Sequence, residues 1–434
     1  MENLIGEKTD LKQIAGILLY TVVFLFPILA AGNPIFGINN INGLFFSECI
    51  IAIASLMALG FNNDIIKKIR VWTLSQWIVG CSAFLYVVFN IAAMVHSINM
   101  FESEMFVFIY LNGFLLLLIT YFILNQKKMD TLLIMLALSS TVISLDGIYQ
   151  TGFWFKHIVD TTGILNWDIL ETAKTTFRAL GTFIHPNVMA GFLLMVIPLV
   201  YMLLIKKNSK PFLFLISVVV TLGLFVTYSR AAIALYIISL PFMFIVLKKE
   251  ESTKKAITYI GIVIVFALVL LVFLISSYNR LNKQTLASKY ALPKISAVND
   301  MSFIVRKDLA MGAIDIIKHH PWLGTGPGTF HIAYRMYQQG AIYSKYAHNN
   351  YLEMASEIGI PGLIVYLIFI GGMLWMLGSA WKRGATLAGV VLISLVLFIL
   401  HTSVDFDYAS PAVVWCLFLY AGASLILADK NYAD

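Results

Sequence analysis

The residue best suited to proton transfer is His348, which lies in a polar, glycine-rich stretch of an otherwise hydrophobic chain. Asn350 followed by Glu353 resembles a capping box, and Gly359 supplies a stop, so the pattern predicts a short helix over 351–358. His348 then precedes the helix N-terminus, where the positive end of the helix dipole disfavours imidazolium and lowers the pKa. A neutral imidazole can accept a proton from a hydroxyl, which makes His348 a candidate general base. The structural alternative is a surface histidine before a membrane-entering helix.

Three arginines predict an anionic ligand. Arg230 occupies a short turn between two long apolar runs, Arg178 lies shortly before another such run, and Arg306 lies in a segment with helical periodicity. A guanidinium group presents paired donors that match phosphate oxygens. Phosphate or diphosphate is therefore the predicted ligand class, and interfacial anchoring or simple solvation of the arginines is the alternative.

Further polar residues are candidates for supporting roles. Asp405 and Asp407 can bind a cation, orient a sugar or pair with an arginine. His185 is a rival base, while Asn187 is interpreted as the N-cap of the apolar run that follows it. The segment 324–328 lacks the Gly-Lys-Ser/Thr continuation of a phosphate loop, so we interpret it as a turn. No metal site is predicted, because the histidines and cysteines lack metal-ligand spacing.

The elements that must position these residues are transmembrane helices. Of the 434 residues, 60% are hydrophobic and 12% are charged, a composition that would leave large apolar patches on a soluble protein. The net charge of +7 is not arranged with aromatic residues into a nucleic-acid groove, so nucleic acid is not expected as a partner. Apolar runs of about twenty residues predict an all-α, polytopic membrane protein with twelve transmembrane helices. The predicted spans are 14–31, 43–60, 72–95, 105–124, 131–149, 187–205, 211–228, 231–247, 257–276, 361–380, 385–401 and 411–428.

Basic residues mark every second loop between these spans. Lys67, Lys68 and Arg70 follow the second span, for example, whereas the preceding loop 32–42 is uncharged. Cytoplasmic loops of membrane proteins carry the excess of lysine and arginine. The alternation therefore predicts that both termini are cytoplasmic.

Two of the outward-facing loops are longer than the others, 150–186 and 277–360, and the second lies between helices 9 and 10. Loops of this length in a compact protein are usually functional or disordered. We predict a single membrane domain over 1–434, with a smaller outer loop and a large outer loop that carries the candidate active site. Within the large loop, apolar residues at helical spacing over 302–319 predict an amphipathic helix at the membrane surface.

Five short motifs follow one another over roughly residues 130–425. They are 178–187 (RALGTFIHPN), 228–231 (YSRA), the Arg306 segment that continues into 320–330 (HPWLGTGPGTF), 347–353 (AHNNYLE) with 359–362 (GIPG), and 401–407 (HTSVDFD). No single motif is decisive. Their order, and the large outer loop between spans nine and ten, resemble the O-antigen ligase and polymerase superfamily of bacterial envelope glycosyltransferases.

The resemblance implies a metal-independent, inverting transferase without a cofactor, on the periplasmic face of the bacterial inner (plasma) membrane. It implies a glycan on undecaprenyl diphosphate as the donor, His348 as the catalytic base, and Arg230, Arg306 and Arg178 as the donor diphosphate-binding residues. The residues expected to support or orient the substrate are Asn349, Asn350, Glu353, Asp405, Asp407 and His185. Expected partners are the lipid-linked oligosaccharide donor, the lipid A core or a growing glycan as acceptor, and membrane lipids.

The leading interpretation of function is an O-antigen ligase, which transfers the glycan to a hydroxyl of the lipid A core oligosaccharide. A polymerase that extends the glycan on the same lipid-linked donor is the closest alternative, because both use the same donor headgroup. A transporter of lipid-linked glycans belongs to a different class. Against it, no repeat relates the two halves of the sequence, whereas many transporters are built from such repeats.

Overall fold

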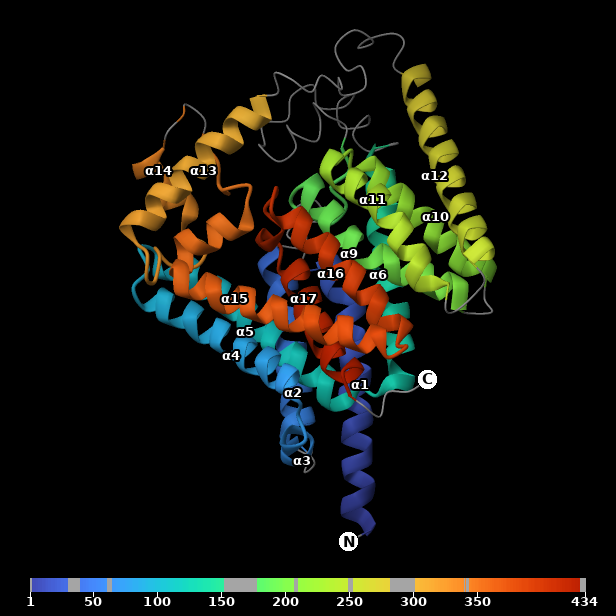
Figure 1. Cartoon of the computed structure of the whole chain (residues 1–434), viewed down its shortest axis with the longest axis horizontal. Helices are drawn as coiled ribbons and strands as arrows, with labels where there is room; N and C mark the ends of the chain where they lie inside the picture. Colours follow the sequence, from blue (N-terminus) through green and yellow to red (C-terminus); the bar gives the residue numbers. More distant parts are fainter. Residues whose placement is uncertain are drawn as a thin grey trace.

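The computed structural model describes residues 2–29, 40–60, 65–151, 178–206, 210–248, 253–281, 301–338, 340 and 343–429. Every regular element within these ranges is a helix, as the sequence predicted (Figure 1). In chain order the helices are α1 (Glu2–Leu29), α2 (Asn40–Gly60), α3 (Ile65–Arg70), α4 (Leu74–Val95), α5 (Met100–Ile123), α6 (Gln126–Tyr149), α9 (Pro186–Lys206), α10 (Lys210–Val226), α11 (Arg230–Leu247), α12 (Thr253–Leu281), α13 (Met301–His319), α14 (Phe330–Tyr337), α15 (Asn350–Lys382), α16 (Thr386–Thr402), the 3-10 turn η3 (Asp407–Ala409) and α17 (Pro411–Leu427).

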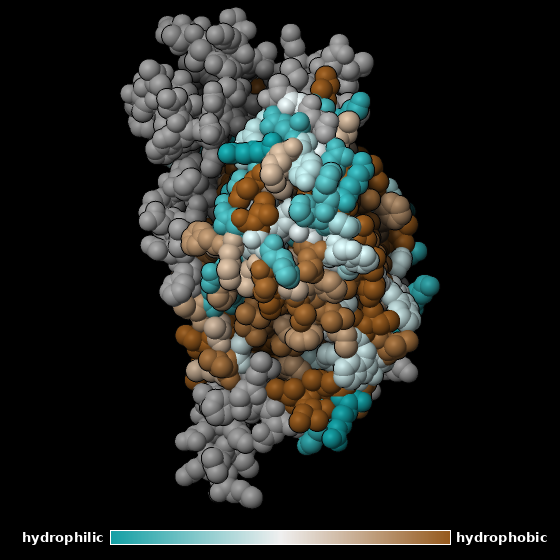
Figure 2. Space-filling view, turned by 90° about the vertical axis from the view of Figure 1, so that its left-hand side faces the viewer, coloured by the Kyte–Doolittle hydropathy of each residue, from teal (hydrophilic) through white to brown (hydrophobic). Residues whose placement is uncertain are grey.

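Seven of the described helices are long and apolar enough to cross a membrane by length and composition, namely α4, α5, α6, α9, α11, α12 and α15. Shorter apolar helices of 10–17 residues lie within α1, α2, α10, α16 and α17. Figure 2 shows hydrophobic side chains in a band across the middle of one face, with hydrophilic groups toward its ends. The fold is that of a polytopic membrane protein, while twelve spans and the cytoplasmic position of both termini remain predictions.

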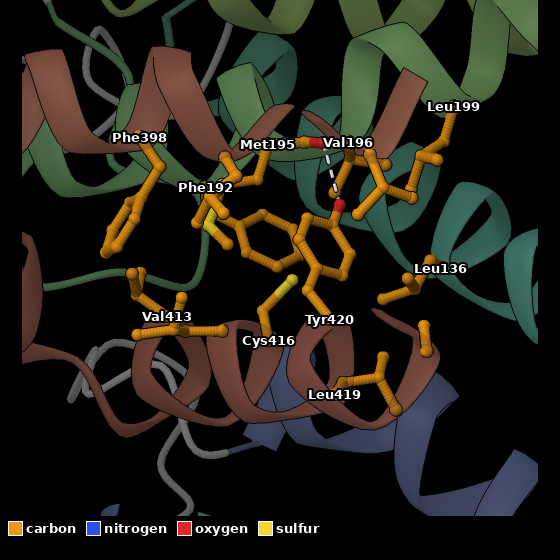
Figure 3. Packing of buried hydrophobic residues seen from close by; sticks show 14 of the residues in the cluster. Leu136, Phe192, Met195, Val196, Leu199, Phe398, Val413, Cys416, Leu419 and Tyr420 are labelled. Carbon is orange, nitrogen blue, oxygen red and sulfur yellow. Dashed lines mark hydrogen bonds between the residues drawn. The ribbon is translucent and has the colours of Figure 1, made fainter. Parts of the chain in front are cut away.

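Helices α9 and α17 form the centre of the bundle. The apolar segment of α9 is completely buried, and so is every residue of α17 from Ala412 to Leu427. The Tyr420 hydroxyl on α17 donates a hydrogen bond of 2.7 Å to the backbone oxygen of Met195 on α9 (Figure 3). By contrast, α12 lies at the edge of the bundle, with only 17% of its apolar segment buried (Figure 1). The residues at the start of α9 and just before α17 are therefore fixed by the best-packed part of the molecule.

The part of the large outer loop that the structure describes is folded. Helix α13 confirms the helix predicted over 302–319, and it contacts both α14 and α15. In Figure 1 the two helices α13 and α14 lie together above α15, on the side of the molecule away from the N-terminus. The position of α13 relative to a membrane surface remains a prediction.

The glycine-rich segment 324–328 is a turn, as interpreted from the sequence, and it packs backbone against backbone on α15. The Thr325 amide donates to the carbonyl of Ser356 at 3.0 Å, and the Gly326 amide donates to the carbonyl of Glu357 at 2.9 Å. This contact fixes the outer segment to the first turns of α15, and a Cβ atom on Gly324 would lie 2.2 Å from the backbone of Glu357.

Helix α15 bends at Gly359, where the sequence predicted a stop. Gly359 has φ 76° and ψ 171°, a conformation that essentially only glycine adopts. The Ile360 amide donates to the carbonyl of Pro321 at 2.8 Å, so the outer chain passes directly over the bend. A Cβ atom on Gly359 would lie 2.2 Å from the backbone oxygen of Trp322.

Replacing Gly359 by alanine should therefore lower the free energy of unfolding by about 1–3 kcal/mol, through backbone strain and the forced separation of the two chain segments. Thermal unfolding of the purified protein in detergent measures the effect. Gly371→Ala, on the same helix, is the matched control, because its Cβ would meet no atom within 4 Å. The control should be neutral or slightly stabilising; equal losses in both variants would show that the bend is not the cause.

Candidate active site

Asp405 is the charged group around which the candidate site is arranged. It lies in the turn between α16 and η3, and its side chain is 1% exposed. Its Oδ2 accepts a hydrogen bond from the Asn187 side chain and lies 3.8 Å from a terminal nitrogen of Arg306. Its Oδ1 lies 3.6 Å from Nδ1 of His348. Burial would raise the pKa of Asp405, but His348 and the neighbouring imidazoles outweigh it and lower the pKa to about 2, so Asp405 is ionised at neutral pH.

Arg178 is held in place from two sides. Its Nε donates a hydrogen bond of 2.7 Å to the carbonyl of Thr227, and a terminal nitrogen donates to the side chain of Asn187. Burial lowers the pKa of Arg178 to about 10; Asp405 opposes this shift, and the charges of Arg230 and Arg306 add to it. The structure therefore brings together the three arginines that were predicted as a group, within electrostatic range of one another.

The other two arginines are more open than Arg178. Arg230 is the first residue of α11 and is exposed, directly after a turn in which Tyr228 has φ 50°. Arg306 projects from α13 with 38% of its side chain exposed, and its Nε has no hydrogen-bond partner among the described residues. Two guanidinium groups with accessible surface thus flank a third that is fixed.

His348 has φ 52°, in the left-handed region that most residues avoid. The following residue, Asn349, is extended, and its side chain accepts hydrogen bonds of 3.0 Å from the amides of Tyr351 and Leu352. The N-cap is therefore Asn349, and the prediction that Asn350 is the cap was wrong by one residue. The turn at His348 is the reason, because it brings the chain into the helix one residue earlier.

Aromatic contacts hold the His348 ring. It meets the ring of Phe406 edge to face at 4.7 Å, and Tyr346 stacks on Phe406 at 4.4 Å. Its Nδ1 is buried toward Asp405, while 22% of the side chain is exposed. A carboxylate on Nδ1 favours the tautomer whose Nε2 lone pair is free to accept a proton.

His185, the rival base, lies against the same Phe406 ring at 5.0 Å. Its Nδ1 accepts a hydrogen bond of 3.2 Å from the amide of Asn187, so that lone pair is already in use. Burial lowers the pKa of His185 to about 3. This imidazole is neutral, with its proton on Nε2, and it is less suited than His348 to accept a proton from a substrate.

Asp407 does not join this cluster. Its Oδ2 lies 2.7 Å from Nδ1 of His401, and both side chains are completely buried. Burial raises the pKa of Asp407 to about 6, although His401 opposes the shift. From the sequence, either aspartate could pair with an arginine. Among the described residues only Asp405 does so, with Arg306. The pair of Asp407 with His401 fixes the turn that presents Asp405.

Glu353 and Asn350, two of the residues predicted to support the substrate, lie at a different cavity from the Asp405 cluster. Glu353 accepts a hydrogen bond of 2.7 Å from the amide of Ala347, and with Asn350 it lines a small cavity beside α4 and α5. Asn349, by contrast, stays at the site as the cap and donates a hydrogen bond of 2.9 Å to the carbonyl of Ser403.

Sequence reasoning missed three residues that build the site. Asn187 was interpreted as a cap, yet its side chain bridges Arg178 and Asp405. Phe406 lies between the two candidate aspartates in the sequence, and this position could have identified it as part of the site. Gln150 accepts hydrogen bonds from the amides of Leu180 and Gly181, at 3.0 and 2.9 Å, and so anchors the segment that follows Arg178. Nothing in its sequence context distinguishes Gln150.

These contacts join the N-terminal ends of α9, α11 and α15. Asn187 belongs to the first turn of α9, Arg230 begins α11, and His348 precedes α15. Helix N-termini and guanidinium groups both favour anions, and a histidine beside them can move a proton. The arrangement is suited to bind a phosphate group and to deprotonate a hydroxyl. In the described part of the chain, no three histidine, cysteine, aspartate or glutamate residues group in a way that could hold a metal ion.

The helices and this site define a polytopic membrane protein with a cation-rich polar site at one end of its bundle. Residues 212–367 match the protein-family model described as O-Antigen ligase, and this match supports the resemblance drawn from the sequence. The match runs from α10 to the part of α15 beyond its bend, and it contains Arg230, Arg306 and His348. It supports a membrane glycosyltransferase-like enzyme of the ligase or polymerase type. Comparison with curated proteins finds no match.

The low pKa of His185 predicts a pH dependence of stability. Its pKa is about 3 in the folded protein and 6.5 ordinarily, so between these values the unfolded chain binds a proton that the folded chain does not. Lowering the pH through this window therefore lowers the free energy of unfolding. His185→Gln should lose less stability than the wild type between about pH 7 and pH 4, measured as the apparent unfolding temperature in detergent.

His319→Gln is the control for this comparison, because His319 is exposed on α13. It should follow the wild-type curve. Parallel curves for the wild type and His185→Gln would mean that His185 titrates normally in the folded protein.

Proposed function

We propose that the protein is an O-antigen ligase, which transfers a glycan from undecaprenyl diphosphate to a hydroxyl of the lipid A core oligosaccharide. The reaction would take place on the periplasmic face of the bacterial inner membrane. The observation that carries the proposal is the gathering of His348, Arg306 and Arg178 around the buried Asp405, with Arg230 in electrostatic range of Arg178. The match of residues 212–367 to the O-Antigen ligase family supports the same class of enzyme.

In this reaction the acceptor hydroxyl oxygen attacks the anomeric carbon of the donor sugar. His348 accepts the hydroxyl proton, a new C–O bond forms, and the bond between the anomeric carbon and the diphosphate oxygen breaks. Undecaprenyl diphosphate leaves with that electron pair. Attack from the side opposite the leaving group inverts the anomeric carbon.

The chain provides the two things that such a transfer needs, charge stabilisation and a placed base. Arg306 and Arg230, which have accessible surface, would bind the diphosphate, and the fixed Arg178 would extend the positive field. Asp405 would orient the imidazole of His348 and stabilise the imidazolium that forms. The separation of 3.6 Å is longer than a hydrogen bond, and contacts of this kind often tighten only when substrate binds.

His348→Ala should lower transfer by about 10²–10⁴-fold, because it removes the group that accepts the proton. The assay uses purified protein, a lipid-linked glycan donor and a defined acceptor, with the unfolding temperature as a check on the fold. His185→Ala is the matched variant, since the two imidazoles flank the same phenylalanine. A larger loss in His185→Ala than in His348→Ala would reverse the assignment of the base.

The same assay distinguishes a residue that acts as the base from a residue that binds the donor. Arg306→Ala should raise the KM for donor more than it lowers kcat, because its contact is made to the diphosphate both before and during reaction. We propose that the transfer is metal-independent, since guanidinium groups can neutralise the leaving group. Activity should then survive a chelator; loss in chelator that a divalent ion restores would reject this part of the proposal.

Analysis of glycans in a strain that lacks the protein tests ligase against polymerase. Loss of a ligase should leave long glycans on the lipid carrier and none on the lipid A core. Short, single-repeat glycans on the lipid carrier would instead identify a polymerase. Lipid-linked glycan that stays on the cytoplasmic side would favour a transporter.

A further inference from the structure

A second polar site lies beside the first turns of α15, separate from the Asp405 cluster. A cavity of about 20 Å³ lies there between α4, α5 and α15, which is room for one particle of the size of water. Its polar lining comes from Tyr86, Tyr110 and Tyr408 and from Asn90, Asn350, Glu353 and Glu357. Phe106, Met354 and Ile358 form part of its apolar wall.

The two carboxylates are one helical turn apart, and a backbone amide holds one oxygen of each. One oxygen of Glu353 accepts a hydrogen bond of 2.7 Å from the amide of Ala347, and one oxygen of Glu357 accepts a hydrogen bond of 3.0 Å from the amide of Phe330. Charged acceptors make the stronger bonds of this type. Among the described residues, neither carboxylate forms an ion pair with lysine or arginine. Two uncompensated negative charges inside the bundle would be costly.

Asn350 shows that the cavity is adapted to a ligand. Its side chain is part of the cavity wall and is only 3% exposed, yet neither its oxygen nor its nitrogen has a hydrogen-bond partner among the described residues. Buried amides are almost always hydrogen-bonded, because the alternative forfeits their hydration without compensation.

An occupant of this cavity has to suit both its volume and the charge of its two carboxylates. A proton shared by the carboxylates would balance one of the two charges but would not fill the space, whereas a monovalent cation beside one such proton would do both. A water molecule would fill the space but would leave both charges uncompensated. Magnesium keeps several of its waters, for which the cavity is too small.

We propose that this cavity binds one dehydrated monovalent cation, sodium or potassium. The ligands would be the free oxygens of Glu353 and Glu357 and the side-chain oxygen of Asn350, with oxygens of Asn90 and Tyr110 completing the shell. The cation would connect α15 to α4 and α5. Through the bond from Ala347 to Glu353 it would also fix the residue that immediately precedes His348.

Binding and stability measurements on the purified full-length protein test the proposal without a transfer assay, and so independently of the proposed function. In buffer with choline as the only monovalent cation, added sodium or potassium chloride should raise the apparent unfolding temperature by about 2–4 °C. Added choline chloride at the same ionic strength should not. Equilibrium binding of radioactive sodium or rubidium should saturate near about one ion per chain, as expected for a one-site cavity.

Glu357→Gln should abolish both the temperature shift and the saturable binding, because it removes half of the negative charge. Glu104→Gln is the matched control, since Glu104 is exposed on α5 and does not line the cavity. If Glu357→Gln does not fold, the wild-type binding measurement decides alone. Absence of saturable ion binding, or stability that responds to pH but not to sodium or potassium, would overturn the proposal.

Discussion

A carboxylate that is 1% exposed in a hydrophobic bundle has to be compensated, and the candidate site follows from that requirement. Asp405 is compensated by an amide from α9, a guanidinium from α13 and an imidazole from the chain before α15. These groups come from distant parts of the sequence, and the interaction of each with the buried carboxylate stabilises its position. Removing Asp405 would leave several positive groups facing one another without a partner.

Helix N-termini also contribute to the positive electrostatic potential of the site. Three of the helices at the site, α9, α11 and α15, present their N-termini to it, so unsatisfied amides and helix dipoles add to the positive field of the arginines. Asp405, the negative group of the cluster, is recessed behind Asn187 and the imidazoles. An incoming anion would therefore meet the accessible Arg230 and Arg306 before it met Asp405. This separation of outer cations from an inner anion distinguishes the cluster from an ordinary structural ion pair.

The helical class, the helix α13 and the bend at Gly359 were predictable, because apolar periodicity, glycine and proline report on local backbone preference. The grouping of the arginines was predictable from charge that is costly near lipid.

The partner of Asp407 was not predictable, since pairing with His401 or with an arginine depends on tertiary distances that spacing along the chain does not encode. The same limit explains Asn187: its sequence position suits a helix cap, but the nearness of Arg178 and Asp405 gives its side chain a different use. The position of the cap at Asn349 depends on the positive φ angle of His348, and a histidine in the sequence does not predict such an angle.

The complete burial of α17 has a consequence for how the protein is made. Synthesis proceeds from the N-terminus, so α17 reaches the membrane after the preceding helices that the structure describes, including α5 and α9, which it contacts. Until it inserts between them, those helices must expose to lipid, or to each other, surfaces shaped for a partner that has not yet been translated. Asp405 and Asp407 lie between α16 and α17, so these two helices hold the segment that carries them. Assembly of the reactive groups is thereby coupled to the seating of α16 and α17, and a chain translated only as far as α15 would have the arginines without the carboxylate that organises them.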